Sequence, residues 1–233
     1  MARNAHPERT RRRILDAAQE LFDERGYEHT SIQDIVDRLG NLSKGAIYHH
    51  FPSKKAILEA ISQRDNAAQE QARRTIAARD DLDGMAKLRE TLRWSTENTA
   101  HMRLIASLTP QLDDPITFAE NIHVWSAKVP KMFLPVIEEG VADGSIPTAY
   151  PRELADLMGL LLNYWTITRY FPAARAQLRH RLECMATMFT ALGAPVLDDE
   201  LVAQMTDTLA AYNGLDGGAE GAPAAGTGVI PTP

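Results

Sequence analysis

Apolar residues recur every three or four positions along most of the 233-residue chain, which is the spacing of one face of an α-helix. Ile14, Leu15, Ala18, Leu21 and Phe22 form one such stripe, which stops where Gly26 would close a helix. No stretch of useful length alternates apolar and polar residues as a strand would. We therefore predict an all-α fold, with helices over residues 7–25, 30–39, 44–51, 53–78, 85–98, 101–108, 115–143, 152–171, 173–192 and 198–212.

Prolines and glycines divide this pattern further. Pro130 and Pro135 fall inside the segment 115–143, where we expect a kink or a break, and Pro172 separates two strongly apolar helices. Residues 213–233 contain six glycines, three prolines and no aromatic residue, so we expect a disordered tail there, and residues 1–6 read as a loose basic arm.

The segment Thr30–Lys55 predicts a helix-turn-helix, T-S-I-Q-D-I-V-D-R-L-G-N-L-S-K-G-A-I-Y-H-H-F-P-S-K-K. Thr30 or Ser31 caps the first helix, and Gly40 stops it. Ser43 caps the second helix, which ends at Pro52 because proline cannot continue the hydrogen-bond ladder.

The second of these helices has two distinct faces. Ile47 and Phe51 lie one turn apart and are expected to be buried, while Gly45 and His49 share the opposite, outer face. Flanking side chains on that face come from Lys44, Ala46 and Tyr48. A DNA major groove admits one α-helix and offers base-edge donors and acceptors. The N–H groups at the Ser43 end suit a backbone phosphate, and Lys54 and Lys55 add cations nearby.

S-K-G-A-I-Y-H-H-F-P-S-K, preceded by T-S-I-Q-D-I-V-D-R-L-G, resembles the DNA-binding domain of the TetR/AcrR family of bacterial transcriptional regulators. The resemblance implies that Lys44 and Gly45 approach bases, and that the other matching positions mainly hold phosphates. The expected DNA-binding residues are Thr30, Ser43, Lys44, Gly45, Ala46, Tyr48, His49, His50, Lys54 and Lys55. Asn41 departs from the pattern, because many members have one residue fewer between the glycine and the capping serine.

The resemblance also implies a domain plan: a three-helix DNA-binding domain in residues 1–55, and a helical bundle for effector binding and dimerisation in residues 56–212. The net charge of −6 is distributed accordingly, since residues 1–55 contain ten basic and eight acidic side chains and the remainder contains 15 and 23. Arg9, Arg11, Arg12 and Arg13 cluster at the start of the first helix, where phosphate contact and a plain solvated face are equally good interpretations.

The helices 152–171 and 173–192 are the expected homodimer interface. They are apolar enough for ordinary core, but in the resembled family the last two long helices pack against their copies in a second subunit. Symmetry supports this, because a two-fold dimer reads two half-sites of double-stranded operator DNA.

A small-molecule effector, apolar or aromatic, is the remaining expected partner. Bulky side chains of the middle and late helices are candidates to line its pocket, although a filled core is the better explanation for any one of them taken alone: Trp94, Met102, Phe118, Trp125, Tyr164 and Trp165.

Several classes of function are not indicated. No phosphate loop, nucleophile elbow or metal signature is evident, and His180 and Cys184 lack further ligands, so we expect neither an enzyme nor a cofactor. Cys184 is the single cysteine and no apolar run is long enough for a leader or a membrane span, which favours a soluble cytoplasmic protein. The leading hypothesis is a repressor released from its operator by a small effector; the alternative is a helical adaptor or enzyme domain with an appended DNA-binding head.

Overall fold

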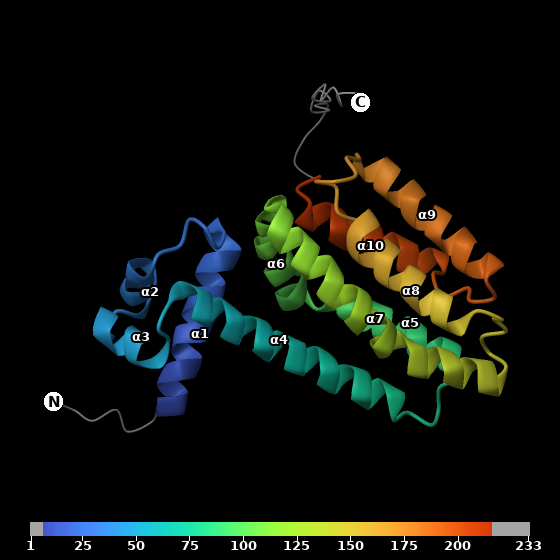
Figure 1. The fold of residues 1–233 in the computed structure, drawn as a ribbon, viewed down its shortest axis with the longest axis horizontal. Helices are drawn as coiled ribbons and strands as arrows, with labels where there is room; N and C mark the ends of the chain where they lie inside the picture. The colour runs from blue at the N-terminus through green and yellow to red at the C-terminus, as the bar shows by residue number, and fades with distance from the viewer. Residues whose placement is uncertain (1–6, 216–233) are drawn as a thin grey trace.

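The computed structural model describes residues 7–215, and within this range the fold is all-helical, as predicted (Figure 1). The helices are α1 (Pro7–Arg25), α2 (Ile32–Leu39), α3 (Lys44–His50), α4 (Lys54–Ala77), α5 (Gly84–Glu97), α6 (Thr99–Leu108), α7 (Pro115–Asp143), α8 (Pro151–Leu160), α9 (Arg175–Ala191) and α10 (Asp199–Tyr212). A short 3₁₀ turn, Thr109–Asp113, joins α6 to α7, and a π-helical turn, Leu161–Trp165, follows α8. The expected N-terminal arm and residues 216–233 of the expected tail lie outside the described residues.

The N-terminal head is built from α1, α2, α3 and the first half of α4. Its core contains Ile14 and Phe22 of α1, Ile35 of α2 and Ile47 of α3, all with at most 1% of their surface exposed. This core also includes, from α4 and α6, Ile57, Leu58, Ala60, Ile61 and Leu104. The head therefore extends past residue 55, where the sequence suggested a boundary, because α4 supplies the apolar face that closes it.

The remaining helices form a second core, in which α5 and α7 cross at two glycines. Leu88, Ile137, Leu154 and Phe189 are fully buried there. A methyl group on Gly84 would lie 2.3 Å from the backbone of Gly140, so the crossing requires a residue without a side chain. Figure 1 shows α4 running from the head along the underside of this second bundle.

Helix α7 is one continuous helix through Pro130 and Pro135, so the break we allowed for does not occur. Each proline removes one backbone donor, but the buried side chains of Val129, Phe133 and Ile137 hold the helix on its neighbours throughout this region.

The prediction of one helix over 152–171 is wrong beyond Leu160. Asn163 Nδ2 donates to the carbonyl of Gly159 at 2.9 Å, and the Thr166 hydroxyl donates to the carbonyl of Leu162 at 2.9 Å, so side chains compete for the backbone where the π-helical turn forms. Arg181 of α9 binds the end of this turn and the segment after it: its Nη1 donates to the carbonyls of Trp165 at 2.8 Å and of Phe171 at 3.1 Å.

Asn213 is also ordered by contacts rather than being the start of a tail. Its Oδ1 accepts a hydrogen bond from the Thr168 hydroxyl at 2.7 Å, and its Nδ2 donates to the carbonyl of Leu209 at 2.7 Å. Across residues 7–215, no helix is both long enough and apolar enough to cross a bilayer.

Candidate nucleic-acid interface and effector cavity

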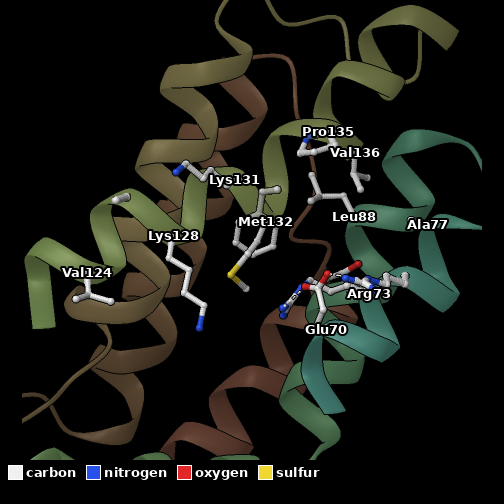
Figure 2. A pocket seen from close by; sticks show the side chains of 14 residues that line it. Glu70, Arg73, Ala77, Leu88, Val124, Lys128, Lys131, Met132, Pro135 and Val136 are labelled. Atoms are coloured by element: carbon white, nitrogen blue, oxygen red, sulfur yellow. Dashed lines mark hydrogen bonds and ion pairs between the residues drawn. The ribbon is translucent and has the colours of Figure 1, made fainter. Parts of the chain in front are cut away.

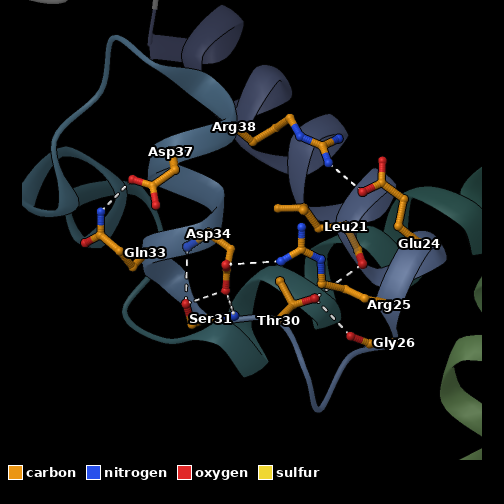
Figure 3. Close-up of polar contacts among 10 residues, drawn as sticks. All are labelled: Leu21, Glu24, Arg25, Gly26, Thr30, Ser31, Gln33, Asp34, Asp37 and Arg38. Carbon is orange, nitrogen blue, oxygen red and sulfur yellow. Dashed lines mark hydrogen bonds and ion pairs between the residues drawn. The ribbon is translucent and has the colours of Figure 1, made fainter.

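Ser31 begins α2 with a reciprocal cap (Figure 3). Its hydroxyl accepts from the Asp34 N–H at 3.2 Å, and Asp34 Oδ2 accepts from the Ser31 N–H at 2.7 Å and from its hydroxyl at 2.5 Å. The hydrogen bond from the Ser31 hydroxyl is the main cause that lowers the pKa of Asp34 below its usual value, and the hydrogen bond from the Ser31 N–H adds to it. This cap fixes the residue at which α2 starts, and therefore helps to fix the position of the turn that follows α2.

Thr30, the other candidate cap, points into the protein. Only 2% of its surface is exposed, and its hydroxyl donates to the carbonyls of Gly26 at 2.9 Å and Leu21 at 3.3 Å, as Figure 3 shows. Its side chain is therefore not exposed for a phosphate in this structure, and contact between Thr30 and DNA stays a prediction. Thr30 instead fastens the chain entering α2 to the end of α1.

The turn between α2 and α3 is fixed by a glycine that the sequence predicted and by a side-chain contact that it did not. Gly40 has a φ of 69°, a left-handed conformation that ends α2, and its N–H donates to the carbonyl of Val36. The additional turn residue, Asn41, accepts a hydrogen bond from Arg13 Nη2 at 2.8 Å. Arg13 thus secures the turn to α1, and no local sequence signal links two residues so far apart.

Helix α3 presents the two faces expected of it. Ile47 is fully buried and Phe51 is 3% exposed, while Tyr48 is 45% exposed. Ser43, Lys44, Gly45 and His49 are also exposed, and Ala46 and His50 are half-buried. The Ser43 hydroxyl accepts from the Ala46 N–H at 3.1 Å and begins the helix. The exposed side of α3 is therefore a narrow polar and aromatic surface with an uncovered backbone at Gly45.

The two lysines after α3 differ in their surroundings. Lys54 Nζ donates to the carbonyl of Tyr27 at 2.7 Å and lies 4.1 Å from the centre of the Tyr27 ring. Its ammonium is thus already bound inside the head, whereas Lys55 is exposed. Arg11 is likewise engaged, 5.1 Å above the ring of Phe51.

A cavity of about 500 Å³ opens between α4, α5 and α7 (Figure 2). Its polar wall carries Glu70, Arg73 and Arg74 from α4 and Lys128 and Lys131 from α7, and its apolar wall includes Leu88, Met132, Phe133 and Val136. This volume is within the range of small-molecule sites.

None of the six residues expected to bind an effector lines this cavity. Phe118 instead packs edge-on against Tyr164, whose hydroxyl donates to Asn121 Oδ1 at 2.9 Å, and Trp125 and Trp165 pack on the C-terminal core. Trp94 and Met102 are half-buried. Within residues 7–215, no group of three His, Cys, Asp or Glu side chains is arranged to hold a metal ion.

A family model described as bacterial regulatory proteins of the tetR family matches residues 14–61, which is the head. The A-factor receptor protein of Streptomyces griseus is 36% identical over 104 residues, covering 45% of this chain and 37% of that protein. UidR, a helix-turn-helix transcriptional regulator of Escherichia coli K12, is 38% identical over 85 residues, covering 36% of this chain and 39% of that protein. These matches thus span well under half the length of either relative.

A longer match comes from the transcriptional repressor KstR2 of Rhodococcus jostii RHA1, which is 30% identical over an alignment of 162 residues that covers 62% of this chain and 72% of that protein. The chain belongs to the TetR family of bacterial regulatory proteins.

The TetR-family fold extends over nearly the whole chain. Salmonella enterica GusR superposes with a TM-score of 0.56 at 22% identity, covering 91% of this chain and 98% of that structure. A gamma-butyrolactone receptor described as ArpA-like superposes with a TM-score of 0.53 at 17% identity, covering 90% and 98%. At these identities the likeness establishes the shared fold alone.

Proposed function

We propose that this TetR-family chain is a transcriptional repressor that binds double-stranded operator DNA as a homodimer and is released by a small molecule. The observation that carries the proposal is the arrangement of α3: its apolar residues are buried in the head, and Lys44, Gly45, Tyr48 and His49 face outward. A helix presented in this way can enter a major groove. Such a protein would act in the cytoplasm, where the DNA of a bacterium lies, and would catalyse no reaction.

In the proposed complex Lys44 and Gly45 approach base edges, with Ala46 beside them, while Ser43, Tyr48, His49, His50 and Lys55 hold the backbone. Lys54 takes part only indirectly, because it fixes Tyr27 and the start of α4. A single head of this size reads only a few base pairs, so specificity requires two copies on a two-fold axis.

The homodimer is proposed to form through α8, the turn that follows it, and α9. The outward stripe of α9 is Ala176, His180, Cys184, Thr187 and Ala191, which are exposed and free of permanent charge. Leu160, at the end of α8, is 46% exposed, and Phe171 is 45% exposed. Such surfaces can pack closely against their own copies without stranding a charge.

Release is proposed to act through α4, because this helix belongs to both parts of the molecule. Its first half is in the core of the head and its second half lines the cavity. A ligand that prefers a different setting of α4 would alter the spacing of the two heads and weaken operator binding by its differential affinity.

DNA binding is tested by replacing Tyr48 and comparing it with a matched tyrosine. Fluorescence anisotropy with duplex DNA from the protein's own promoter should show Tyr48→Ala binding about tenfold more weakly, the loss expected for one charge-assisted contact. Tyr150→Ala is the control, since Tyr150 is 56% exposed before α8, away from the head. Equal affinity of the Tyr48 variant and wild type, or no preference of wild type for the promoter over random duplex, would refute the proposal.

The dimer is tested by placing a charge on the stripe of α9. With Cys184→Arg, two guanidinium groups would meet near the two-fold axis, so light scattering after gel filtration should show a shift from dimer to monomer. Ala119→Arg, on an exposed position of α7, is the matched control and should remain dimeric. A dimeric Cys184 variant would place the interface elsewhere.

A further inference from the structure

The cavity between α4, α5 and α7 contains more positive than negative charge. Arg73, Arg74, Lys128 and Lys131 line it, with Glu70 as the single carboxylate among the lining residues. This is notable in a part of the chain, residues 56–233, where acidic side chains outnumber basic ones by 23 to 15. The excess of cations is therefore a local feature and does not follow from the overall composition.

Internal partners neutralise only part of this charge. Glu70 is shared, accepting from Arg73 Nη2 at 2.9 Å and from Arg74 Nε at 2.9 Å. Lys128 Nζ donates to a neutral acceptor, Asn66 Oδ1, at 2.9 Å and lies 4.6 Å from the centre of the Trp125 ring. Asp65 also acts on Lys128 electrostatically, but it pairs with His101 at 2.8 Å.

The carboxylates near Lys128 therefore do not balance the positive charge of Lys128 and Arg73. Burial is the main cause that lowers its pKa, and repulsion from Arg73 adds to this, while Asp65 and Glu70 only partly oppose the shift. A negatively charged group in the cavity would relieve the repulsion between Lys128 and Arg73. Figure 2 shows Lys128 extending from α7 toward the side of the cavity where α4 carries Glu70 and Arg73.

Apart from Thr91, whose hydroxyl donates to the carbonyl of Lys87 at 2.8 Å, the rest of the cavity lining is apolar. Leu88 of α5 and Met132, Phe133 and Val136 of α7 supply this apolar lining, and Met132 and Val136 are the more exposed of the four. An inorganic anion would leave this wall without a partner, and a neutral apolar molecule would leave the cations without one. A ligand that satisfies both walls has an apolar body and an acidic group.

We propose that this cavity binds an amphipathic anion, a small molecule whose acidic group is held by Arg73 and Lys128 and whose apolar body packs on Met132 and Val136. Arg73 can offer a second N–H to a carboxylate or a phosphate while Arg74 retains Glu70. That this anion is the effector that releases DNA rests on the proposed function, but its binding in the cavity does not.

The test begins with the wild-type protein and ligands that share one ten-carbon chain. Isothermal titration calorimetry is carried out with decanoate, decyltrimethylammonium and 1-decanol, each below its aggregation limit, and with acetate. The expected result is that decanoate binds at least about tenfold more tightly than any of the other three, as one charge-assisted hydrogen-bonded contact predicts. Preference for the cation or the alcohol, or equal affinities, would overturn the proposal.

Variants then locate the site. Arg73→Gln and Lys128→Gln should each weaken decanoate binding about tenfold and leave 1-decanol binding unchanged. Arg79→Gln is the matched control, because Arg79 is exposed just beyond α4, pairs with Asp81 and does not line the cavity. Unchanged decanoate affinity in both cavity variants would place the anion elsewhere and refute the assignment. If either variant failed to fold, the ligand series on wild type would still decide the ligand class.

The same samples separate this proposal from the proposed function. Operator binding is measured by anisotropy without ligand and then with saturating decanoate. If the protein bound decanoate selectively but bound its promoter no better than random duplex, the cavity assignment would hold and the proposed regulatory function would be refuted. If the protein bound its operator but showed no preference for decanoate, the DNA-binding function would hold and the cavity assignment would be refuted.

Discussion

Gly45 gives α3 an uncovered stretch of backbone on its exposed side. A methyl group there would lie 3.8 Å from the Ser43 hydroxyl, an ordinary contact, and would meet nothing else nearby. The fold therefore does not require glycine at this position, in contrast to Gly84. A requirement for glycine would have to come from a partner that approaches the backbone closely, which is what a base edge in a major groove would do.

Gly45→Ala should therefore separate DNA binding from stability. Alanine is favoured over glycine in helices, so the free energy of unfolding should stay the same or rise by up to about 1 kcal/mol. Operator affinity should fall about tenfold, the loss of roughly one base contact. Urea denaturation and anisotropy on the same preparation measure the two effects. Unaltered operator affinity would show that the backbone at Gly45 does not approach DNA.

Other polar residues near α3 have a structural role that their sequence context conceals. Arg13 binds Asn41 and Lys54 binds the carbonyl of Tyr27, so both fix the geometry of the head although both resemble phosphate ligands. Their partners lie 28 and 27 positions away in the chain. Contacts at such separation depend on how α1 packs across the turn, which no local pattern encodes.

At the scale of elements, the helices whose ends are marked by capping residues were predictable. Ser43, Ser53 and Asp198 each accept a backbone N–H three residues later, and the helices they begin start where the sequence predicts. The end of α8 was not predictable, because the apolar pattern continues through Leu161 and Leu162 while Asn163 and Thr166 divert the backbone. The cavity lining was not predicted for a different reason. The candidates chosen from the sequence were mainly aromatic, whereas the cavity is lined largely by long cationic side chains and by aliphatic ones.

The crossing of α5 and α7 brings the backbones of the two helices into close contact at Gly84 and Gly140. Gly84→Ala would place a methyl group 2.3 Å from the backbone of Gly140, which cannot move without displacing α7 from Ile146. We expect the free energy of unfolding to fall by about 3 kcal/mol, the upper range for overpacking. Urea denaturation measures this, with Gly45→Ala as the glycine-to-alanine control in open space. Wild-type stability of the Gly84 variant would show that the two helices can separate at little cost.

At the scale of the whole molecule, α4 contacts the head and the second bundle at several points along its length. Ile57 and Ile61 are in the core of the head, and Arg64 binds Asp16 of α1 at 2.6 Å. Asp65, the next residue, pairs with His101 of α6. Beyond this level the helix reaches the cavity at Glu70 and Arg73. A displacement of α4 by a ligand would therefore be transmitted to α1, provided that the helix between residues 65 and 70 stays rigid.

Weakening that stretch should uncouple the two parts while leaving each intact. Ala67 and Ala68 are exposed in the middle of α4, so Ala67→Gly with Ala68→Gly removes two exposed methyl groups and costs mainly helix propensity, about 2 kcal/mol for the pair. Operator affinity without ligand and decanoate affinity should each remain within about threefold of wild type, since both sites are preserved and a factor of three is under 1 kcal/mol. The loss of operator affinity caused by decanoate should shrink. Ala119→Gly with Ala142→Gly, at exposed positions of α7, imposes the same propensity cost outside α4 and should keep the full response. A full response in the α4 variant as well would assign the coupling to α6, which reaches the core of the head through Leu104.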